Sequence, residues 1–278
     1  MATPGTDRYA VIGNPIGHSL SPRIHSLFAE QTGQRLQYDR LLAPLDGFRE
    51  AAAGFFAAGG RGLNVTVPFK LEAAAWVDEL DEDARFAGAV NTIRLLPGGA
   101  LEGFNTDGPG LVADLGRHVR SGVKLNILLL GAGGAARGVA RPLARALASR
   151  LVIANRTPER AGQIAAALSA QIPGLEVSGG GLEAPSGAFD LVINASSAGL
   201  DDQAPAIDPA LARGALCYDM VYGAETAFCR WARRAGARVA VDGLGMLVEQ
   251  AALAFELWRG VRPETGPVLT ALREDGST

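Results

Sequence analysis

Lysine occurs at only two positions of this 278-residue chain, Lys70 and Lys124, although Lys and Arg together number 26. Lys70 ends the polar and apolar run that begins at Asn64. An arginine at this position would keep the charge but could not release a proton near neutral pH, whereas surroundings can shift the pKa of an ammonium group. Lys70 is therefore a candidate for proton transfer. A surface lysine that opens a helix is the alternative at this stage.

Small hydroxyls, amides and one carboxylate gather in three clusters in the first part of the chain. The clusters are Ser19 with Ser21, then Asn64 with Thr66 and Lys70, and finally Asn91-Thr92 with Asn105-Thr106-Asp107. Each cluster follows an expected strand, and open α/β sheets bind ligands at strand ends. Hydroxyls can bind a carboxylate, and amides and an Asp–Lys pair can bind alcohols and a carbonyl. These groups together suit a small polyhydroxylated acid.

Purely structural roles are the alternative for several of these residues. Ser21 before Pro22 is typical of a helix N-cap, and Asp107 could cap a helix that starts after Pro109. Asn105 suits a turn.

A glycine-rich loop follows the apolar strand expected at Lys124–Leu130. It reads Gly131-Ala132-Gly133-Gly134-Ala135-Ala136 and leads into a helix through Leu147. In this G-x-G-x-x-A pattern, Gly131 permits a tight turn and Gly133 lets the backbone approach a pyrophosphate, which the helix N-terminus binds. Ala136 allows the helix to pack closely on the strand. The order strand, glycines, helix predicts a dinucleotide site.

The end of the next strand indicates which dinucleotide. NAD-binding folds usually place Asp or Glu there to hold the ribose 2′-OH. This chain has Asn155-Arg156-Thr157-Pro158 instead, with Arg160 just beyond. Without the acid, and with a guanidinium able to pair a 2′-phosphate, the sequence favours NADP. Thr157 and Pro158 also suit the start of a helix, and both roles are compatible.

Apolar strands alternate with helical patterns throughout, which predicts an α/β chain with parallel sheets and crossover helices. In the first third we expect strands at Tyr9–Ile12, Gln37–Leu41 and Gly62–Val65, helices at Pro22–Gln31, Leu45–Ala57 and Phe69–Leu80, and a hairpin of Thr92–Leu96 with Ala100–Phe104. After Asp107 a second unit is expected, with further strands at Leu151–Ala154, Leu191–Asn194, Leu216–Tyr222 and Arg238–Val241. Helices at Leu247–Trp258 and Pro267–Arg273 follow, after a hinge at Gly243 and Gly245.

Composition excludes several classes of protein and site. The charge is balanced, with a net charge of −3 and no basic stripe, so nucleic acid and acidic membranes are poor partners. No run approaches the ~20 apolar residues of a membrane span, and no signal peptide is seen, so a cytoplasmic location is expected. Cys217 and Cys229 are expected to be free buried thiols. The three histidines lack metal-ligand spacing, so we expect no metal site.

The ordered motifs resemble those of the shikimate dehydrogenase family over essentially the whole chain. The matching stretches are Gly13 to Pro22, Asn64 to Lys70, Gly88 to Thr92, Asn105 to Gly108, Gly131 to Ala135, Asn155 to Thr157, Asn194 to Ser196, Asp219 to Tyr222 and Asp242 to Leu247. Two departures stand out. The loop after Tyr222 is one residue shorter than the family's usual form, and Ala136 replaces a serine that many relatives have.

The resemblance implies two α/β domains with a cleft between them. Residues 1–106 and 243–278 would form the substrate-binding domain, and residues 107–242 a Rossmann-like NADP-binding domain. The implied activity is the reversible, NADP-dependent reduction of 3-dehydroshikimate to shikimate in aromatic amino-acid biosynthesis, by a monomer or homodimer. The alternatives are a quinate/shikimate dehydrogenase that prefers NAD and a non-catalytic sensor of NADPH or shikimate on the same fold.

The resemblance also assigns residues. Lys70 and Asp107 form the catalytic pair. The substrate would be held by Ser19 and Ser21 at its carboxylate, and by Asn64, Thr66, Asn91 and Gln250 elsewhere, with Tyr222 nearby. The cofactor would contact Gly131, Ala132, Gly133, Gly134, Ala135, Asn155, Arg156, Thr157, Arg160, Ala195, Ser196, Ser197, Met220, Gly243 and Met246.

Overall fold

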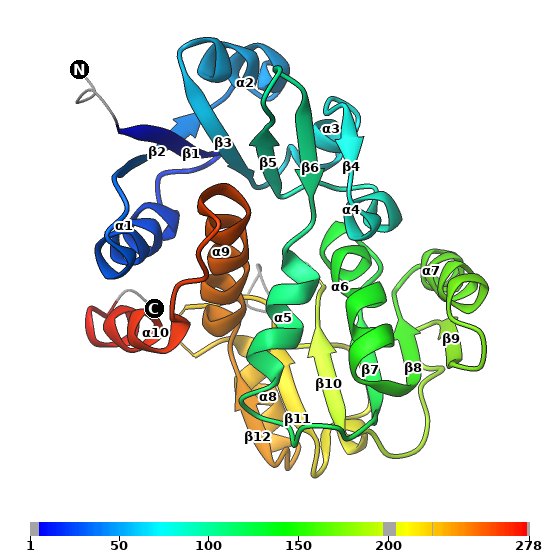
Figure 1. Ribbon diagram of the computed structural model, residues 1–278. Helices are drawn as coiled ribbons and strands as arrows, with labels where there is room; N and C mark the ends of the chain where they lie inside the picture. Colours follow the sequence, from blue (N-terminus) through cyan, green and yellow to red (C-terminus); the bar gives the residue numbers. More distant parts are fainter. Residues whose placement is uncertain (1–5, 197–203, 224, 277–278) are drawn as a thin grey trace. The chain divides into compact units, whose positions relative to one another are not determined.

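The computed structural model describes residues 6–196, 204–223 and 225–276 (Figure 1). They divide into two compact units. The first holds the described residues up to Gly110 and those from Val248 onward, and the second holds Leu111–Leu247. The expected domain boundaries, 106/107 and 242/243, lie a few residues from these limits. As a result, Asp107 falls in the first unit, whereas Gly243 and Met246 fall in the second. The domain assignment itself stays a prediction.

The first unit contains a mixed six-stranded sheet in the order β2-β1-β3-β5-β6-β4. Its strands are β1 (Asp7–Gly13), β2 (Leu36–Leu42), β3 (Gly60–Val65), β4 (Glu79–Leu80), β5 (Thr92–Leu95) and β6 (Leu101–Phe104). β1 pairs in parallel with β2 and β3, as crossover helices require, while β5 runs antiparallel to β3 and β6. The expected hairpin is therefore confirmed as β5–β6.

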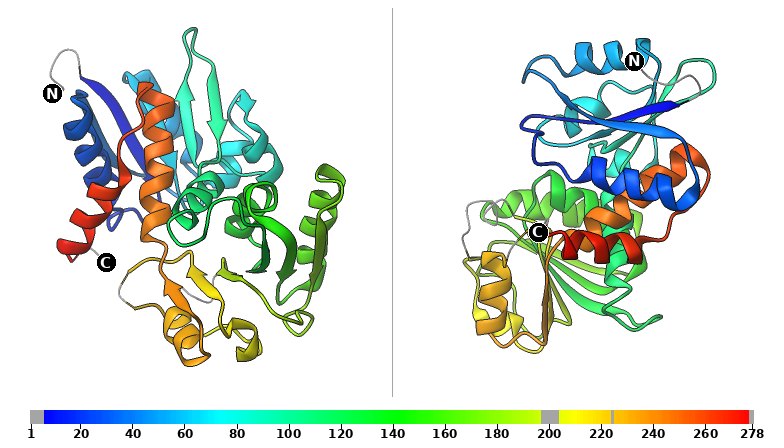
Figure 2. Two further views of the ribbon diagram at one scale, coloured as in Figure 1. Left: turned by 60° about the horizontal axis from the view of Figure 1, so that its bottom comes forward. Right: turned by 90° about the vertical axis from the view of Figure 1, so that its left-hand side faces the viewer.

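Helices cover both faces of this sheet (Figure 2). They are α1 (Ser21–Thr32), α2 (Phe48–Ala57), α3 (Lys70–Ala74), α4 (Glu82–Ala87), α9 (Leu244–Arg259) and α10 (Thr265–Glu274). Alternation along β1 assigns the faces, because successive side chains of a strand point to opposite sides. Tyr9 stacks on Trp258 of α9, whereas Ala10 and Ile12 join the core formed with Phe48 of α2.

The long helix expected at Phe69–Leu80 is wrong. The helix α3 ends at Ala74, and Glu79 and Leu80 form the edge strand β4 beside β6. The backbone N–H of Asp78 bonds the carbonyl of Leu101, and that of Asp81 bonds the carbonyl of Gly103. Pairing with a distant strand therefore overrides the local helical pattern, which the sequence alone does not reveal.

The second unit contains a parallel six-stranded sheet in the order β12-β11-β10-β7-β8-β9. Its strands are β7 (Leu125–Leu130), β8 (Ala148–Ala154), β9 (Glu176–Gly180), β10 (Leu191–Asn194), β11 (Leu216–Asp219) and β12 (Val239–Val241). Counted along the chain, this order is 6-5-4-1-2-3, the doubly wound arrangement of dinucleotide-binding folds. The order reverses between β7 and β10, where such folds bind their ligand. The edge strand β9 was not expected from the sequence.

Different helices cover the two faces of the second sheet. These are α5 (Asp107–Leu115), α6 (Gly134–Ala146), α7 (Pro158–Gln171) and α8 (Ala227–Arg234), with a short 3₁₀ helix, η2 (Pro209–Ala212). Leu128, Val192 and Cys217 pack with Phe228 of α8 on one face. On the other face Tyr218 reaches Asp114 of α5. Cys217 and Cys229 are both free and buried, as expected.

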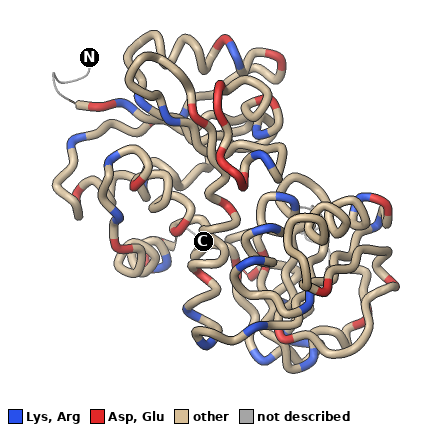
Figure 3. Tube along the Cα trace, turned by 45° about the vertical axis from the view of Figure 1, so that its right-hand side comes forward, with Lys and Arg blue, Asp and Glu red and all other residues tan. Residues whose placement is uncertain are grey.

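No helix within the described ranges is long and apolar enough to span a bilayer. Lys and Arg occur in both units, and so do Asp and Glu (Figure 3).

An aromatic cluster lies between α1, α9 and the first sheet. His25 of α1 is fully buried, stacks on Tyr38 with ring centroids 4.1 Å apart, and also contacts Phe28, Phe255 and Trp258. Neither ring nitrogen of His25 makes a hydrogen bond. Burial lowers the pKa of His25 from 6.5 to about 3, and the nearby Asn64 side chain offsets only part of this effect. The imidazole is therefore neutral in the folded protein at neutral pH.

This burial predicts an acid-sensitive fold. Between pH 6.5 and 3 the unfolded chain binds a proton at His25 that the folded chain does not, so the free energy of unfolding falls as pH drops. The contribution is about 3 kcal/mol between about pH 6.5 and about pH 4. Denaturant unfolding across this range should show a shallower pH dependence for His25→Phe than for the parent. Replacing the exposed His18 by Gln is the control. Equal slopes for His25→Phe and the parent would contradict a neutral buried imidazole.

Candidate active site

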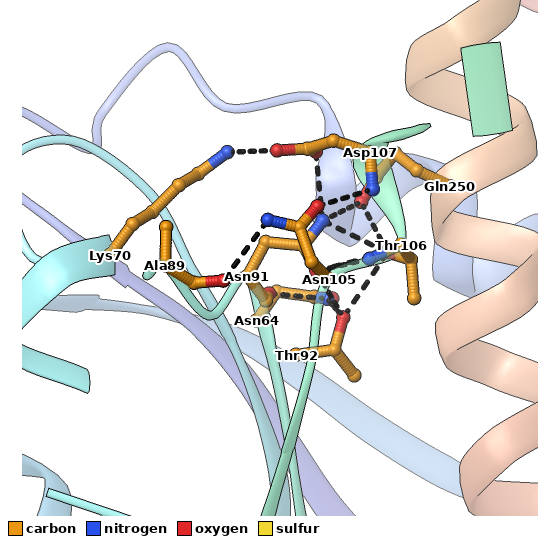
Figure 4. A network of polar contacts seen from close by, with 9 residues as sticks. All are labelled: Asn64, Lys70, Ala89, Asn91, Thr92, Asn105, Thr106, Asp107 and Gln250. Atoms are coloured by element: carbon orange, nitrogen blue, oxygen red, sulfur yellow. Dashed lines mark hydrogen bonds and ion pairs between the residues drawn. The ribbon is translucent and has the colours of Figure 1, made fainter. Parts of the chain in front are cut away.

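Lys70 and Asp107 form an ion pair in the first unit (Figure 4). Lys70 begins α3 after β3, and Asp107 begins α5 after β6, so two strand-to-helix junctions supply the pair. Lys70 Nζ donates to Asp107 Oδ2 at 2.6 Å, and the side chains are 30% and 13% exposed. Lys70 is the first residue of a helix, as the alternative to a catalytic role predicted. Its ammonium is nonetheless largely shielded and fixed by a charge-assisted hydrogen bond.

Asn91 holds the second oxygen of Asp107. Its Nδ2 donates to Asp107 Oδ1 at 2.8 Å and to Thr106 Oγ1 at 2.9 Å. Its Oδ1 accepts from the backbone N–H of Thr106 at 2.8 Å and from Thr92 Oγ1 at 3.1 Å. Asn91 is only 2% exposed, so these bonds are made away from water. One carboxylate oxygen is thus committed to Lys70 and the other to Asn91, which fixes the plane of the carboxylate.

Gln250 and Asn64 extend this network (Figure 4). Gln250 Oε1, from α9, lies 3.4 Å from Asn91 Nδ2 and 3.5 Å from Thr106 Oγ1. Asn64, at the end of β3, donates from Nδ2 to the Asn91 carbonyl at 3.2 Å and to Thr92 Oγ1 at 3.0 Å. The structure therefore brings together the predicted residues Asn64, Lys70, Asn91, Asp107 and Gln250.

Thr66 and the two serines lie on neighbouring segments of the same unit. The Thr66 hydroxyl makes no hydrogen bond to another described residue, and its methyl group lies against Gly13, where an added Cβ would come within 2.4 Å. Ser19 Oγ accepts the backbone N–H of Ser21 at 3.3 Å. Ser21 is the first residue of α1 and Leu20 its N-cap, so the cap predicted for Ser21 is wrong.

The other two structural alternatives have different outcomes. The cap predicted for Asp107 is wrong, because α5 begins at Asp107 itself and its carboxylate bonds Lys70 and Asn91 instead. The turn role of Asn105 is confirmed, because its Oδ1 accepts the N–H of Asp107 and its Nδ2 donates to the Ala89 carbonyl.

The glycine loop of the second unit follows β7 at the centre of the parallel sheet. Gly131 has a φ of 109°, and a Cβ there would lie 2.8 Å from the carbonyl oxygen of Ala195, so only glycine fits. Gly133 and Gly134, at the start of α6, have nothing within 4 Å of an added Cβ. This open space lies at the helix N-terminus, where backbone N–H groups are free to bind a phosphate. Ala136 is fully buried, which fits its predicted packing role.

Several predicted nicotinamide-side residues meet at the carboxyl ends of β10 and β11. A Cβ on Gly131 would meet the backbone of Ala195 and Ser196, and the N–H of Met220 bonds the Asn194 carbonyl. The N–H of Gly243 bonds the Val221 carbonyl, and a Cβ on Gly243 would lie 2.4 Å from the Met220 oxygen. Close backbone packing, which a side chain would prevent, thus explains this glycine. The predicted Ser197 lies outside the described residues.

Sequence reasoning missed the buried side chains that support this rim. Asp219 Oδ1 accepts from Asn194 Nδ2 at 3.0 Å, and Asn194 Oδ1 accepts from the hydroxyl of Ser196 at 2.6 Å. Tyr218 donates to Asp114 Oδ2 at 2.7 Å, and its hydroxyl accepts the N–H of Met246 at 3.2 Å. Burial raises the pKa of Asp219 and of Tyr218. Polar residues inside otherwise apolar strands were the available signal.

The residues predicted to read the ribose follow β8 directly. Asn155 donates from Nδ2 to the Thr157 carbonyl at 2.9 Å, and Thr157 is the N-cap residue of α7, although its side chain makes no capping bond. Arg156 and Arg160 are both exposed. Tyr222 also belongs to this unit, is partly buried, and has a pKa raised by burial. Its assignment to the substrate stays a prediction.

Two other expectations concern Lys124 and metals. Lys124 Nζ donates to the carbonyls of Arg145 and Ala146, both at 3.1 Å, and so stabilises the end of α6. In the part of the chain that the structure describes, no group of three His, Cys, Asp or Glu side chains is placed to hold a metal ion.

Family models match three parts of the chain. The shikimate dehydrogenase substrate binding domain matches residues 11–93, and shikimate / quinate 5-dehydrogenase matches residues 116–199. The shikimate 5'-dehydrogenase C-terminal domain matches residues 243–273.

Whole proteins with known names match over nearly their full length. The shikimate dehydrogenase (NADP(+)) of Bordetella avium is 56% identical over 278 residues, covering 97% of this chain and 96% of that protein. The enzyme of the same name from Alkalilimnicola ehrlichii is 54% identical over 275 residues, with 97% and 100% covered.

Solved structures agree. The Ael1 enzyme from Pseudomonas putida superposes with a TM-score of 0.89 at 42% identity, covering 96% of this chain and 98% of that one. The shikimate 5-dehydrogenase of Thermus thermophilus, solved with NADP(H) and shikimate, gives 0.84 at 36% identity, with 97% and 99% covered. By sequence and by fold, over nearly its full length, the chain belongs to the shikimate dehydrogenase family.

Proposed function

We propose that this protein is an NADP-dependent shikimate dehydrogenase, which reversibly reduces 3-dehydroshikimate to shikimate. The observation that carries the proposal is the 2.6 Å bond between Lys70 and Asp107, held from behind by Asn91. The Lys70 ammonium can donate a proton, and the hydroxyls and amides around it suit a polyhydroxylated acid. Relatives 54% and 56% identical over nearly the whole chain are named for this reaction.

Lys70 acts as the general acid in the reductive direction. When bound to the second unit, NADPH would supply the hydride that the C3 carbonyl requires. Lys70 Nζ gives its proton to the oxygen as negative charge develops there, and it takes the proton back in the oxidative direction. Asp107 keeps the ammonium oriented, and Asn91 keeps Asp107 from rotating. Each group is therefore in place before the substrate arrives, which lowers the reorganisation needed in the transition state.

The remaining candidate residues bind the substrate. Ser19 and Ser21 offer hydroxyls to its carboxylate. Asn91 and Gln250 belong to the network described above, and Thr66 follows the last residue of β3. All three would contact the ring hydroxyls. The Thr66 hydroxyl, which bonds no other described residue, is free to do so.

The second unit has the features that NADP requires. The space beside Gly133 and Gly134 accepts a pyrophosphate at the start of α6. The absence of an acid at Asn155 removes repulsion of a 2′-phosphate, and the exposed Arg156 and Arg160 can pair with it. The cytoplasmic location and the monomeric or homodimeric state are part of this proposal. The two free buried thiols support a reducing compartment.

Initial rates with shikimate and quinate, each with NADP and NAD, test the function directly. Shikimate with NADP should exceed quinate with NADP by about tenfold or more in kcat/KM, since quinate adds a hydroxyl beside the carboxylate that Ser19 and Ser21 bind. Equal turnover of both acids would favour the quinate/shikimate alternative. Binding without turnover would favour a sensor.

Replacing Lys70 by Arg separates charge from proton transfer. Arginine keeps the positive charge but is a far poorer proton donor and base. If Lys70 transfers the proton, kcat for shikimate oxidation should fall ~10²–10⁴-fold, while the KM for NADP stays near normal.

Lys124→Arg is the matched control, because it changes the only other lysine. Arginine can still bond the carbonyls of Arg145 and Ala146, so this variant should keep the parental kcat. A Lys70→Arg enzyme within a few-fold of the parent would show that charge alone suffices, and the proton would have to come from Asp107 or water.

Replacing Arg156 by Ala tests 2′-phosphate recognition. The KM for NADP should rise by an amount equivalent to ~1.5–3 kcal/mol, the range for hydrogen bonds to charged groups, while the KM for NAD stays nearly unchanged. Equal weakening of both cofactors would mean that Arg156 contacts the adenine or supports the fold.

A further inference from the structure

Strand β2 carries two side chains that reach the substrate half of the site, although only a structural role was expected of it from the sequence. Tyr38 and Arg40 are two residues apart and therefore point to the same side of the strand. Both contact residues assigned to the substrate, and neither was predicted as a site residue.

Tyr38 holds one predicted substrate ligand, Asn64, and interacts with a second, Ser21. Its hydroxyl donates to Asn64 Oδ1 at 2.7 Å, and the Ser21 side chain lowers the pKa of that hydroxyl, against the larger rise that burial causes. Both N–H groups of the Asn64 amide are already bonded to the Asn91 carbonyl and Thr92 Oγ1. The bond from Tyr38 therefore fixes the orientation of the Asn64 amide, with Oδ1 toward Tyr38 and Nδ2 toward Asn91 and Thr92.

The buried His25 holds the Tyr38 ring in its plane. The two rings are stacked, with centroids 4.1 Å apart and an interplanar angle of 7°. The ring nitrogens of His25 make no hydrogen bond, so the imidazole acts here through its shape and contact area. With its ring clamped, Tyr38 presents its hydroxyl at one position between α1 and β3.

Arg40 holds the backbone of the serine segment. Its Nε and Nη2 donate to the Ser19 carbonyl at 3.2 and 2.6 Å. Among the described residues, no carboxylate forms an ion pair with Arg40. Its positive charge therefore lies beside the serine segment. The hydroxyls of Ser19 and Ser21, which are predicted to bind the substrate, carry no charge themselves.

We propose that Tyr38 and Arg40 are positioning residues for the substrate. Tyr38 aligns Asn64 through its hydroxyl. Arg40 clamps the Ser19 carbonyl and gives the serine segment a positive charge that attracts an anionic substrate. The inference rests on the proposed function, because it takes the ligand of Ser19 and Ser21 to be the carboxylate of shikimate.

Tyr38→Phe removes the hydroxyl and keeps the stacked ring. The KM for shikimate should rise about three- to tenfold, the worth of a hydrogen bond between neutral groups, with kcat within about twofold of the parent. The KM for NADP should not change. Tyr9→Phe is the matched control, because Tyr9 stacks on Trp258 in the same cluster but its hydroxyl meets Arg259.

Arg40→Gln tests the charge. The KM for shikimate should again rise about three- to tenfold. Added salt screens the attraction between charges and raises the KM of the parent, so the KM of Arg40→Gln should rise less with added salt than that of the parent. Arg35→Gln is the control, because it removes one exposed positive charge just before β2 and should keep the parental salt dependence. Unfolding midpoints within a few degrees of the parent will show that both variants are folded.

The outcomes separate two failures. If the parent oxidises shikimate but Tyr38→Phe and Arg40→Gln behave like their controls, the inference is wrong and the proposed function stands. If kcat falls while KM is unchanged, the two residues act on the chemical step and the positioning role is wrong. If the parent does not oxidise shikimate, the proposed function falls, and the inference falls with it.

Discussion

The hydrogen bonds of Asn91 are the constraint on which the catalytic half of the structure depends. One amide group, almost fully buried, binds the Asp107 carboxylate, the Thr106 backbone and the Thr92 hydroxyl. Its own backbone carbonyl accepts from Val65 and from Asn64. Because a buried amide must satisfy its donors and acceptors, Asn91 leaves Asp107 a single orientation. Lys70 then has a fixed partner, and in the proposed reaction the proton has a fixed origin.

The sheet geometry explains why residues far apart in the chain can share this network. β3 and β5 are antiparallel neighbours, and the register pairs Asn64 with Thr92. β5 also pairs with β6, which leads through Asn105 and Thr106 into α5 and Asp107. The hairpin therefore turns an otherwise parallel sheet so that the start of β5 and the end of β6 lie beside the end of β3. In the second unit the parallel order alone is sufficient, since β7, β10 and β11 all end at the same edge.

The sequence predicted those features that depend on local chemistry. Gly131 needs a positive φ, the hairpin has glycines at its turn, and the strands of the second unit are continuous apolar runs, so all three were recognised. It failed where a distant partner decided the outcome. The strand β4 exists because β6 offers an unpaired edge, and the edge strand β9 likewise depends on β8. Tyr38, Arg40 and Asp114 carry no motif of their own. Asp219 lies in a stretch that resembles the family, but only the folded chain shows what it touches.

The cofactor half follows the same logic as the catalytic half, with a buried acid in place of a buried amide. Asp219 is fully buried, and burial raises its pKa because it disfavours the ionised form. Its Oδ1 accepts from Asn194 and from the N–H of Val221, and Asn194 fixes Ser196 beside the glycine loop. In both units, therefore, residues buried behind the site restrict the side chains and loops that face the ligand, and the buried polar groups are best understood as determinants of geometry rather than of stability.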